Sequence, residues 1–570
     1  MVLHDGPMTQ TGRTLVDLLD GAAARYGERP ALALGRDDGH TRAWSYRELD
    51  RRSRLAAWRL RSCGLRPGDR LLTWSASGPE LAAAYFGAMR AGLILVPLDL
   101  RMAPATIAKI AERSGAVQLA IGSGRDAPDP AEADLEAMPF VTLEELCSEP
   151  DAAFPADWEA ILATWARPEP GDPYLLVFTS GTTGAPKGVV LAHENTMAGI
   201  DGFHQLVPDM DYRVTSVLPL AHLFEQAIGL YLVLDLGADI VYVRTRNPRV
   251  ILESIRDHRT TAMILVPQLL ELFWSAVERE VERQGQAAQF RRARMVARRL
   301  PMAARRLLFR RIHRQLGGHL RLLVSAGAFL PPAVQQGWEE IGIVVMQGYG
   351  STETGSGTCT TLRDHPRGTV GRPVPGMELR IADDGEILFR GPSVTRGYWQ
   401  DPEATAAVFT EDGFYRSGDL GRLDRRGRLV LHGRKRDIIV LPNGLNVFPE
   451  DVENALHVAG VRDSIVLETT PGRIEAIILA PLAGQGSAGG NVDGSPAGAF
   501  DDEATATRVR AEVDAAVKAA NATLAVHARI AAWRFWPDVD FPRTLTLKVK
   551  RDQVRAWAAV SAPLPVTEGS

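Results

Sequence analysis

Cysteine is scarce in this sequence, with only Cys63, Cys147 and Cys359 among 570 residues. The three are widely spaced and odd in number. A disulfide framework uses cysteines in pairs, and a cysteine-based zinc site needs several of them close together. The pattern therefore argues against both and favours a reducing compartment.

An excess of charge of one sign is also missing. Lysine and arginine number 65 against 69 aspartates and glutamates, which gives a net charge of −4 and a pI near 6.3. This balance argues against nucleic acid as the main partner. The first residues, MVLHDGPMTQ, lack the basic region and apolar run of a secretory signal, so we expect a cytoplasmic protein.

The most apolar long stretch, Val214 to Val243, contains the acidic and histidine side chains His222, Glu225, Asp235 and Asp239. Ionisable groups are expensive inside a bilayer. We therefore expect buried strands and a helix here rather than a membrane span.

The chain is too long for a single compact core, so two or more domains are expected. Short β-like runs alternate with helical ones, as in LLTWSA, the helix Pro79 to Arg90, and LILVPLD. Ser45 and Glu48 have the spacing of a capping box before another helix. The rhythm returns after residue 188, and this βαβ pattern predicts an α/β protein with two parallel-sheet subdomains.

From Val370 to Leu431 the pattern changes to short β-like pieces joined by turns, which predicts a small β-barrel or sheet. A charged hinge candidate that contains Arg436 follows, and an α+β unit begins there. The predicted domains are thus 1–435 and a smaller, mobile C-terminal domain, 436–570. Within the latter, a stretch at 483–503 that is rich in Gly, Ser and Ala predicts a disordered insertion.

One long region contains no acidic residue. Residues 284–320 hold ten arginines, all between Arg291 and Arg314, interleaved with apolar side chains. This pattern predicts a basic amphipathic helical region. Two interpretations stay open: a solvated helical face, or a surface that attracts an anionic ligand or, as a peripheral contact, an anionic membrane.

The most informative segment is YLLVFTSGTTGAPKGVVLAHEN, which places the loop Thr179 to Gly188 between two β-like runs. Small residues expose backbone N–H groups, hydroxyls add donors, and Lys187 adds positive charge, which together suit a polyphosphate. The loop is not a P-loop, because Lys187 follows Pro186 and a strand rather than a helix comes next. An ordinary Gly-rich turn is the structural alternative.

Six further motifs follow along the chain: LPLAHLFE (218–225), LVSAGAFLPP (323–332), QGYGSTET (347–354), YRSGDLG (415–421), LPNGLNVFPEDVE (441–453) and FPRTLTLKVKR (541–551). With the loop, they resemble the adenylate-forming (AMP-binding) superfamily of acyl-CoA synthetases, luciferases and peptide-synthetase adenylation domains. The resemblance covers nearly the whole chain and is strongest to long-chain fatty acyl-CoA synthetases.

This resemblance implies an enzyme that uses ATP and Mg²⁺ to activate a carboxylic acid, here a medium- or long-chain fatty acid, as an acyl-adenylate. The acyl group then passes to the thiol of coenzyme A. His222 would line the carboxylate pocket, Thr352 would touch the α-phosphate and Glu353 would hold the metal. The implied ATP-binding residues are Thr179, Ser180, Gly181, Thr182, Thr183, Gly184, Lys187, Gly327, Ala328, Gln347, Gly348, Tyr349, Gly350, Ser351, Asp419 and Arg434.

The resemblance also assigns roles near the C-terminus. Lys548 would be the catalytic lysine of adenylation, with Lys550 a weaker candidate; Arg436 would lie in the hinge and Gly444 in the CoA channel. Two positions depart from the family pattern, since Leu547 replaces a glycine and Arg436 stands where Asp or Lys is usual. The segment AIGLYLVLDLGA, with Ala326 and Gly327, could line an apolar tunnel.

Three alternatives remain. An acyl carrier protein could replace CoA as the acceptor, because the thiol chemistry is the same. An amino-acid adenylation domain is disfavoured because no Asp other than Asp235 is evident to hold an ammonium group. From another class, the chain could be a non-catalytic nucleotide-binding protein, although Glu353, Asp419 and Lys548 are all present.

Overall fold

The computed structural model describes residues 12–35, 42–124, 127–150, 154–179, 186–245, 247–442, 445–479, 503–538, 540–543, 549–560 and 564–565. The chain forms two compact units. The larger comprises Met1–Arg380, Leu388–Ser417 and Gly427–Leu429, and the smaller comprises Ile381–Ile387, Gly418–Arg426 and Val430–Ser570. Short pieces before residue 435 thus belong to the smaller unit, and a domain boundary at 435/436 stays a prediction.

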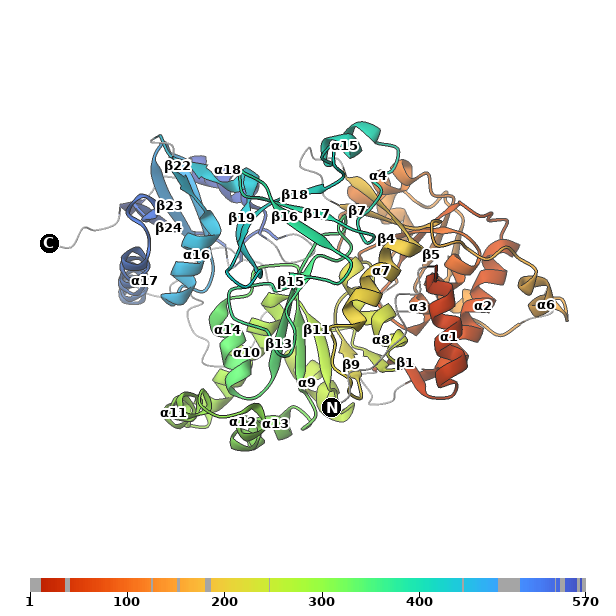
Figure 1. Cartoon of the computed structure of the whole chain (residues 1–570), viewed down its shortest axis with the longest axis horizontal. Helices are drawn as coiled ribbons and strands as arrows, with labels where there is room; N and C mark the ends of the chain where they lie inside the picture. The colour runs from red at the N-terminus through yellow and green to blue at the C-terminus, as the bar shows by residue number, and fades with distance from the viewer. Residues whose placement is uncertain are drawn as a thin grey trace. The chain divides into compact units, whose positions relative to one another are not determined.

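A nine-stranded sheet forms one half of the larger unit, in the order β15-β14-β13-β12-β11-β9-β10-β1-β2 (Figure 1). Its strands from β13 to β1 run parallel. Their bounds are β1 Pro30–Leu34, β2 Arg42–Ser45, β9 Arg213–Ser216, β10 Asp239–Tyr242, β11 Ala262–Leu265, β12 Leu322–Ser325, β13 Val344–Tyr349, β14 Thr358–Cys359 and β15 Arg372–Pro373.

A six-stranded sheet forms the other half, in the order β6-β5-β3-β4-β7-β8. Strand β8 pairs antiparallel with β7, and the other pairings are parallel. The two parallel sheets confirm the predicted α/β class. The bounds are β3 Arg70–Trp74, β4 Ile94–Leu98, β5 Gln118–Ile121, β6 Phe140–Thr142, β7 Pro173–Thr179 and β8 Lys187–Ala192.

Helices connect the strands of the larger unit, and the predicted helix Pro79–Arg90 has those bounds. Proline at the first helical position suits its start. At α2 only half of the predicted capping box forms: the Glu48 amide donates to Ser45 Oγ at 3.2 Å, while the Glu48 carboxylate pairs with Arg52. The helices are α1 Leu15–Tyr26, α2 Tyr46–Ser62, α3 Pro79–Arg90, α4 Pro104–Ser114, η1 Pro130–Ala133, α5 Leu143–Leu146, α6 Trp158–Ala163, α7 His193–His204, η2 Glu225–Tyr231, α8 Leu232–Asp235, α9 Pro248–Asp257, α10 Pro267–Arg283, α11 Ala287–Ala297, α12 Met302–Leu308, α13 Arg310–Gln315, α14 Pro332–Glu340 and α15 Pro402–Ala407.

The stretch from Val214 to Val243 forms β9, the π-helix η2, α8 and β10, and most of its apolar side chains are buried. This confirms the prediction of strands and a helix. Among the residues with described structure, no helix is long and apolar enough to cross a membrane.

The remaining strands form three small sheets. Strands β16 Glu378–Ile381, β17 Glu386–Arg390, β18 Tyr415–Leu423 and β19 Leu429–Arg434 make a four-stranded sheet where short β pieces were predicted. Strands β20 Ile439–Val440 and β21 Asn446–Val447 pair antiparallel. The smaller unit also has the sheet β22-β23-β24-β25 and an apolar core of its own. Its elements are η3 Lys435–Asp437, α16 Pro449–Val458, β22 Ser464–Thr470, β23 Arg473–Ile478, α17 Glu503–Thr523, η4 Val526–Ala528, β24 Ala532–Phe535, α18 Arg551–Val560 and β25 Leu564–Pro565.

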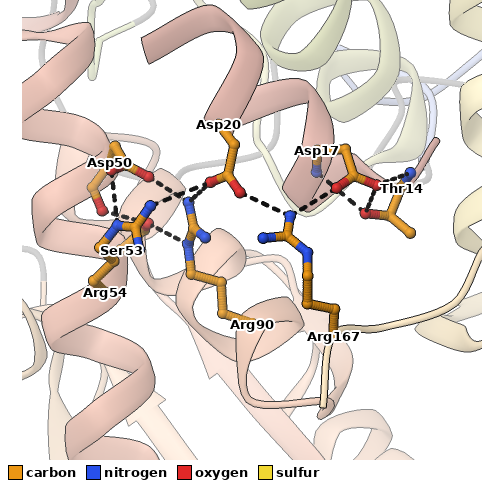
Figure 2. Close-up of polar contacts among 8 residues, drawn as sticks. All are labelled: Thr14, Asp17, Asp20, Asp50, Ser53, Arg54, Arg90 and Arg167. Carbon is orange, nitrogen blue, oxygen red and sulfur yellow. Dashed lines mark hydrogen bonds and ion pairs between the residues drawn. The ribbon is translucent and has the colours of Figure 1, made fainter. Parts of the chain in front are cut away.

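A buried arginine joins the first three helices of the larger unit (Figure 2). Arg90, at the end of α3, donates to Asp20 of α1 at 2.6 Å and pairs with Asp50 of α2. Its Nε also donates to Ser53 Oγ at 2.9 Å. Because a buried guanidinium needs several acceptors, this cluster fixes the three helices to one another.

We expect Arg90→Ala to lower the free energy of unfolding by about 2 kcal/mol or more, because it removes the buried cation between Asp20 and Asp50 and leaves them only the more exposed Arg54 and Arg167. Urea unfolding followed by tryptophan fluorescence measures this loss. The matched control is Arg167→Ala, because Arg167 also pairs with Asp20 but its side chain is 59% exposed. An exposed pair contributes below about 1 kcal/mol. Equal losses in the two variants would contradict this account.

Candidate active site

The carboxyl ends of the parallel strands carry most of the predicted site residues. In the nine-stranded sheet, His222 follows β9, Gly327 and Ala328 follow β12, and Tyr349 ends β13. In the six-stranded sheet, Thr179 ends β7. Open α/β sheets bind their ligands beyond these ends. The topology therefore brings together residues that are distant in sequence.

Asp99 joins the carboxyl edges of the two sheets. It follows β4 of the six-stranded sheet, and its Oδ2 lies 3.0 Å from His222 Nε2, beyond β9 of the other sheet. Arg101 also donates to both Asp99 oxygens, at 2.9 and 2.6 Å. Burial opposes ionisation, but the hydrogen bonds from His222 and Arg101 outweigh it and hold the pKa of Asp99 well below its usual value. Since an ionised carboxylate only accepts hydrogen bonds, Nε2 of His222 carries the proton.

Ser77 makes a second connection between the sheets. It follows β3, and its hydroxyl donates to the Leu218 carbonyl at 3.1 Å and accepts from the Leu220 amide at 2.9 Å. Both partners lie in the turn that leads from β9 to His222. The backbone before His222 is therefore held on the six-stranded sheet.

Tyr398 links Lys187 to Glu353. The Tyr398 hydroxyl donates to Glu353 Oε1 at 3.2 Å, and Lys187 Nζ lies 5.2 Å from the centre of its ring. Burial, and then the charge of Glu353, raises the pKa of Tyr398 to about 12, so its hydroxyl keeps the proton that it donates. One tyrosine thus holds an ammonium group and a carboxylate close together.

The backbone around Tyr398 explains this arrangement. Residues 397–399 lie beside β8, where the Val190 amide donates to Gly397 at 3.1 Å and the Trp399 amide donates to Gly188 at 2.7 Å. The Thr395 amide donates to the Glu353 carbonyl at 2.7 Å. The segment therefore bonds to β8, which begins at Lys187, and also to the turn that holds Glu353.

A compact turn presents Thr352 and Glu353. The Ser351 amide donates to Thr354 Oγ1 at 2.9 Å, and the Thr354 amide donates back to Ser351 Oγ at 3.3 Å. The hydroxyls of Ser351 and Thr354 thus accept hydrogen bonds from backbone amides of the turn itself. Thr352 and Glu353 between them are only half buried, which leaves room for contact with a ligand.

The predicted adenine-side residues lie at the carboxyl ends of the neighbouring strands β12 and β13 or just beyond them, and Ser325 pairs with Gln347 between these strands. Gly327 has φ +90°, a conformation that favours glycine. The Gln347 side chain is buried and donates to Gln335 Oε1 at 2.8 Å. Gly348 and Gly350 flank the half-buried Tyr349. The nucleotide roles of these residues stay predictions.

Two predicted ribose ligands form an ion pair within the smaller unit. Arg434 Nε lies 2.8 Å from Asp419 Oδ1. Glu450 is close to this pair, and its pKa is raised to about 7, first by burial and then by the charge of Glu453. Arg436 lies in η3 and is exposed, and its hinge role stays a prediction.

Several predicted residues lie outside the described part of the chain: Ser180, Gly181, Thr182, Thr183, Gly184, Gly444 and Lys548, with the predicted insertion up to residue 502. The two sides of the glycine-rich loop are described. Thr179 and Lys187 are partners across the β7–β8 pair. The predicted order of strand, loop and strand is therefore confirmed.

A narrow cavity lies between α7, η2 and the end of the turn with Glu353. Its lining includes Gly199, Phe203, Leu223, Ala227 and Gly355, with Asn195 and Thr196. Leu223 is next to His222 in sequence. Of the predicted apolar tunnel, Ala227 lines this cavity, whereas the Leu230 and Leu234 side chains are buried in the interior.

The sequence and the fold resemble those of known proteins. A family model described as AMP-binding enzyme matches residues 19–399. The chain is 32% identical over 540 residues to the long-chain-fatty-acid–CoA ligase FadD15 of Mycobacterium bovis, with 88% of each chain covered. The chain belongs to the AMP-binding enzyme family. The family and this relative make it an acid–thiol ligase.

Two solved structures share the fold of this AMP-binding enzyme. One is the anthranilate CoA ligase AuaEII in complex with anthranoyl-AMP, with TM-score 0.74, 20% identity and coverage of 98% of this chain and 99% of that one. The other is O-succinylbenzoate coenzyme A synthetase (MenE) from Bacillus subtilis in complex with ATP and magnesium ion. Its TM-score is 0.71 at 22% identity, with 96% of this chain and 100% of that one covered.

Sequence reasoning missed three features of this AMP-binding enzyme: the anchor pair Asp99 and Arg101, the bridging Tyr398, and the buried Glu225. No spacing in the sequence indicates the contact of Asp99 with His222, which crosses between the sheets. For Tyr398 the sequence gives only a weak indication of function: the aromatic pair Tyr398 and Trp399 follows Gly397 in a polar stretch.

Glu225 is buried at the start of η2. Its Oε1 accepts from Ser216 Oγ at 2.5 Å, and no hydrogen bond to its Oε2 occurs within the described structure. Burial raises its pKa to about 8, although the Ser216 hydrogen bond acts in the opposite direction. A Cβ on Gly229 would lie 2.5 Å from the Glu225 carboxyl carbon, so a side chain at that position would require the carboxyl group to move. The raised pKa favours the protonated, neutral form of Glu225.

We expect Glu225→Gln to change how stability depends on pH. Between the ordinary value near 4.5 and about 8, the folded wild type keeps a proton that the unfolded chain has lost. Its stability therefore falls as pH rises through this window, by at most about 1.4 kcal/mol per pH unit. The neutral amide removes this loss, so the variant's melting temperature relative to wild type should rise from pH 5.5 to pH 8.5. Parallel profiles across that range would show that Glu225 is not protonated.

Proposed function

We propose that this AMP-binding enzyme joins a medium- or long-chain fatty acid to coenzyme A, with ATP as the energy source and Mg²⁺ as the cofactor. The observation that carries the proposal is the pair of Lys187 and Glu353 held by Tyr398. An ammonium group and a carboxylate so close together suit a nucleoside triphosphate bound with a divalent cation. His222 would contact the carboxylate of the acid, and the apolar side chains Leu223 and Ala227 beside it would contact the acid's chain.

The metal fits the residues that are present. Glu353 offers carboxylate oxygens, which Mg²⁺ prefers, and it is half buried at the turn. When bound, Mg²⁺ would neutralise phosphate charge, with Glu353 as its protein ligand and the phosphates as the others. Tyr398 limits the rotation of the Glu353 side chain through its hydrogen bond.

In the first half-reaction, a carboxylate oxygen of the acid attacks the α-phosphorus of ATP and forms a P–O bond. The bond to the bridging oxygen breaks, and pyrophosphate leaves with its electron pair. Lys187, Thr352 and Lys548 would stabilise the growing negative charge, while Asp419 and Arg434 would hold the ribose. His222, oriented by Asp99, would position the acid.

In the second half-reaction, the thiolate sulfur of CoA attacks the carbonyl carbon of the acyl-adenylate. A thioester forms and AMP leaves, because the phosphate is a far better leaving group than the oxide of a free carboxylate. Gly444 would leave room for the thiol arm. A rotation of the C-terminal domain about Arg436 would replace Lys548 by this channel.

Support for an apolar acid comes from the cavity and from the relatives. Leu223, Ala227 and Phe203 contribute apolar surface to the cavity. The aligned relative is named as a ligase of long-chain fatty acids, whereas the two structural neighbours are named for anthranilate and O-succinylbenzoate. The chain length of the acid therefore belongs to the proposal.

The role of Lys548 tests the two-step reaction. We expect Lys548→Ala to slow fatty-acid-dependent exchange of pyrophosphate into ATP by about 10²–10³, since an electrostatic donor is lost from the first transition state. Thioester formation from supplied acyl-adenylate and CoA should largely survive. The control is Lys550→Ala, which removes a nearby exposed lysine.

Equal losses in both half-reactions would refute the assignment of Lys548. Exchange that requires an amino acid, or transfer to holo acyl carrier protein but not to CoA, would refute the proposed substrates. Nucleotide binding without exchange for any acid would refute the enzymatic function.

The cavity should set the length of the acid. We expect Gly199→Leu to fill it and to lower kcat/KM for long acids by at least about tenfold, while short acids keep most of their rate. Phe203→Ala should shift the preference toward longer or bulkier acids. The measurement is pyrophosphate release across a series of acid lengths. If both variants leave the length profile unchanged, the acid binds elsewhere.

A further inference from the structure

The arginine-rich helices α11, α12 and α13 contain two kinds of arginine. Four of the ten arginines bond inward to the larger unit. Arg294 and Arg298 donate to Glu340 of α14 at 2.6 and 2.7 Å. Arg305 and Arg306 donate to the carbonyls of Glu339 and Leu320 at 2.8 and 2.7 Å. These four stabilise the packing of the helices.

The other six arginines are exposed, and none has a carboxylate partner within the described ranges: Arg291, Arg292, Arg299, Arg310, Arg311 and Arg314. Residues 284–320 contain no acidic side chain. The positive charge of these six arginines is therefore not neutralised by nearby carboxylates of the described chain, and it does not stabilise the fold through ion pairs there.

Large apolar side chains are exposed among these arginines. Met295 is 57% exposed, Val296 58%, Leu307 70% and Leu308 44%. Fifteen large apolar side chains of the described chain are exposed, and these four fall within residues 295–308. Scattered single exposures are normal on a protein surface, but a cluster has a function more often.

Helical spacing places the two kinds of side chain on the same face. On α11, Met295 is four residues from Arg291 and Val296 is four residues from Arg292, so each pair is adjacent on the helix surface, and Arg299 follows two residues after the helix ends. Leu307 and Leu308 end α12, and Arg310 and Arg311 begin α13. We call Arg291, Arg292, Met295, Val296, Arg299, Leu307, Leu308, Arg310, Arg311 and Arg314 the outer face.

The inner side of the same helices packs on the unit. Ala297 and Phe309 are buried in the core cluster around β11 to β13, and Phe290 and Ile312 pack against it. Helix α11 contacts α10 and α14, and α13 contacts α9. The three helices lie side by side along one edge of the unit (Figure 1). The outer face is thus a rigid surface rather than an unfolded tail.

We propose that the outer face docks on the surface of an anionic lipid bilayer. Arginines attract lipid phosphates, and the exposed Leu, Met and Val side chains enter the boundary between headgroups and acyl chains. A nucleic acid fits this face less well, because Leu, Met and Val offer no stacking surface and Phe290 and Phe309 pack inward. Because the whole chain has a net charge of −4, we expect the attraction to anionic lipids to be confined to this face.

Vesicle flotation with the full-length chain tests this proposal. We expect binding to phosphatidylcholine vesicles that contain about 30% phosphatidylserine, and much weaker binding to phosphatidylcholine alone, in about 0.1 M salt. Each arginine near an anionic surface strengthens binding by about fivefold. The triple variant Arg292→Gln, Arg299→Gln and Arg311→Gln should therefore weaken it by about 100-fold. The double variant Val296→Ser and Leu307→Ser should also weaken it.

The matched control removes three exposed arginines from elsewhere on the larger unit: Arg66→Gln, Arg113→Gln and Arg249→Gln. It should bind vesicles like wild type, and all variants should keep wild-type activity on a water-soluble acid. Absence of binding to anionic vesicles, or equal loss in the control, overturns the proposal. If wild type does not bind vesicles but self-associates, and the outer-face variants abolish that, the face is a protein interface and the lipid assignment is wrong.

Discussion

A buried carboxylate, Asp99, holds the two parallel sheets of the larger unit together at their carboxyl ends. Each sheet by itself presents side chains along that edge, but nothing in one sheet determines where the other sheet's side chains lie. An ionised carboxylate that is almost fully buried requires partners. Asp99 takes Arg101 from its own loop and His222 from the other sheet. Its need for these partners fixes the position of the acid-side loop.

Tyr398 connects two segments on the side of the site that is predicted to bind phosphate. It lies on a segment that bonds to the strand beginning at Lys187 and to the turn that presents Glu353. Strand β8, which begins at Lys187, is therefore connected through this segment to the turn that presents the predicted metal ligand Glu353. Electrostatic catalysis depends on charged and hydrogen-bonding groups that are already in place before the reaction. The contacts of Tyr398 and its neighbours hold Lys187 and Glu353 in place in this way.

Much of the fold could be predicted because local pattern determines it. The helix Pro79–Arg90 and the strand–loop–strand order around Thr179 and Lys187 follow from apolar spacing, proline position and glycine-rich turns. The contact of Asp99 with His222 and the contacts of Tyr398 could not be predicted, because they join segments far apart in sequence and leave no periodic signal. The arginine-rich region shows the same limit. Its helices were predictable, but the partners that distinguish the inward-bonding arginines from the other six, such as Glu340 for Arg294 and Arg298, lie outside these helices.

The central claim is that the acid attacks the α-phosphorus of ATP and becomes an acyl-adenylate before it meets CoA. The most direct test supplies a fatty acid whose carboxylate oxygens carry a heavy-oxygen label, together with ATP, Mg²⁺ and CoA, and follows the label by mass spectrometry. Our account predicts that each turnover leaves one labelled oxygen in AMP, with unlabelled pyrophosphate as the other product. Label in inorganic phosphate with release of ADP, or thioester formation without label in AMP, would contradict it.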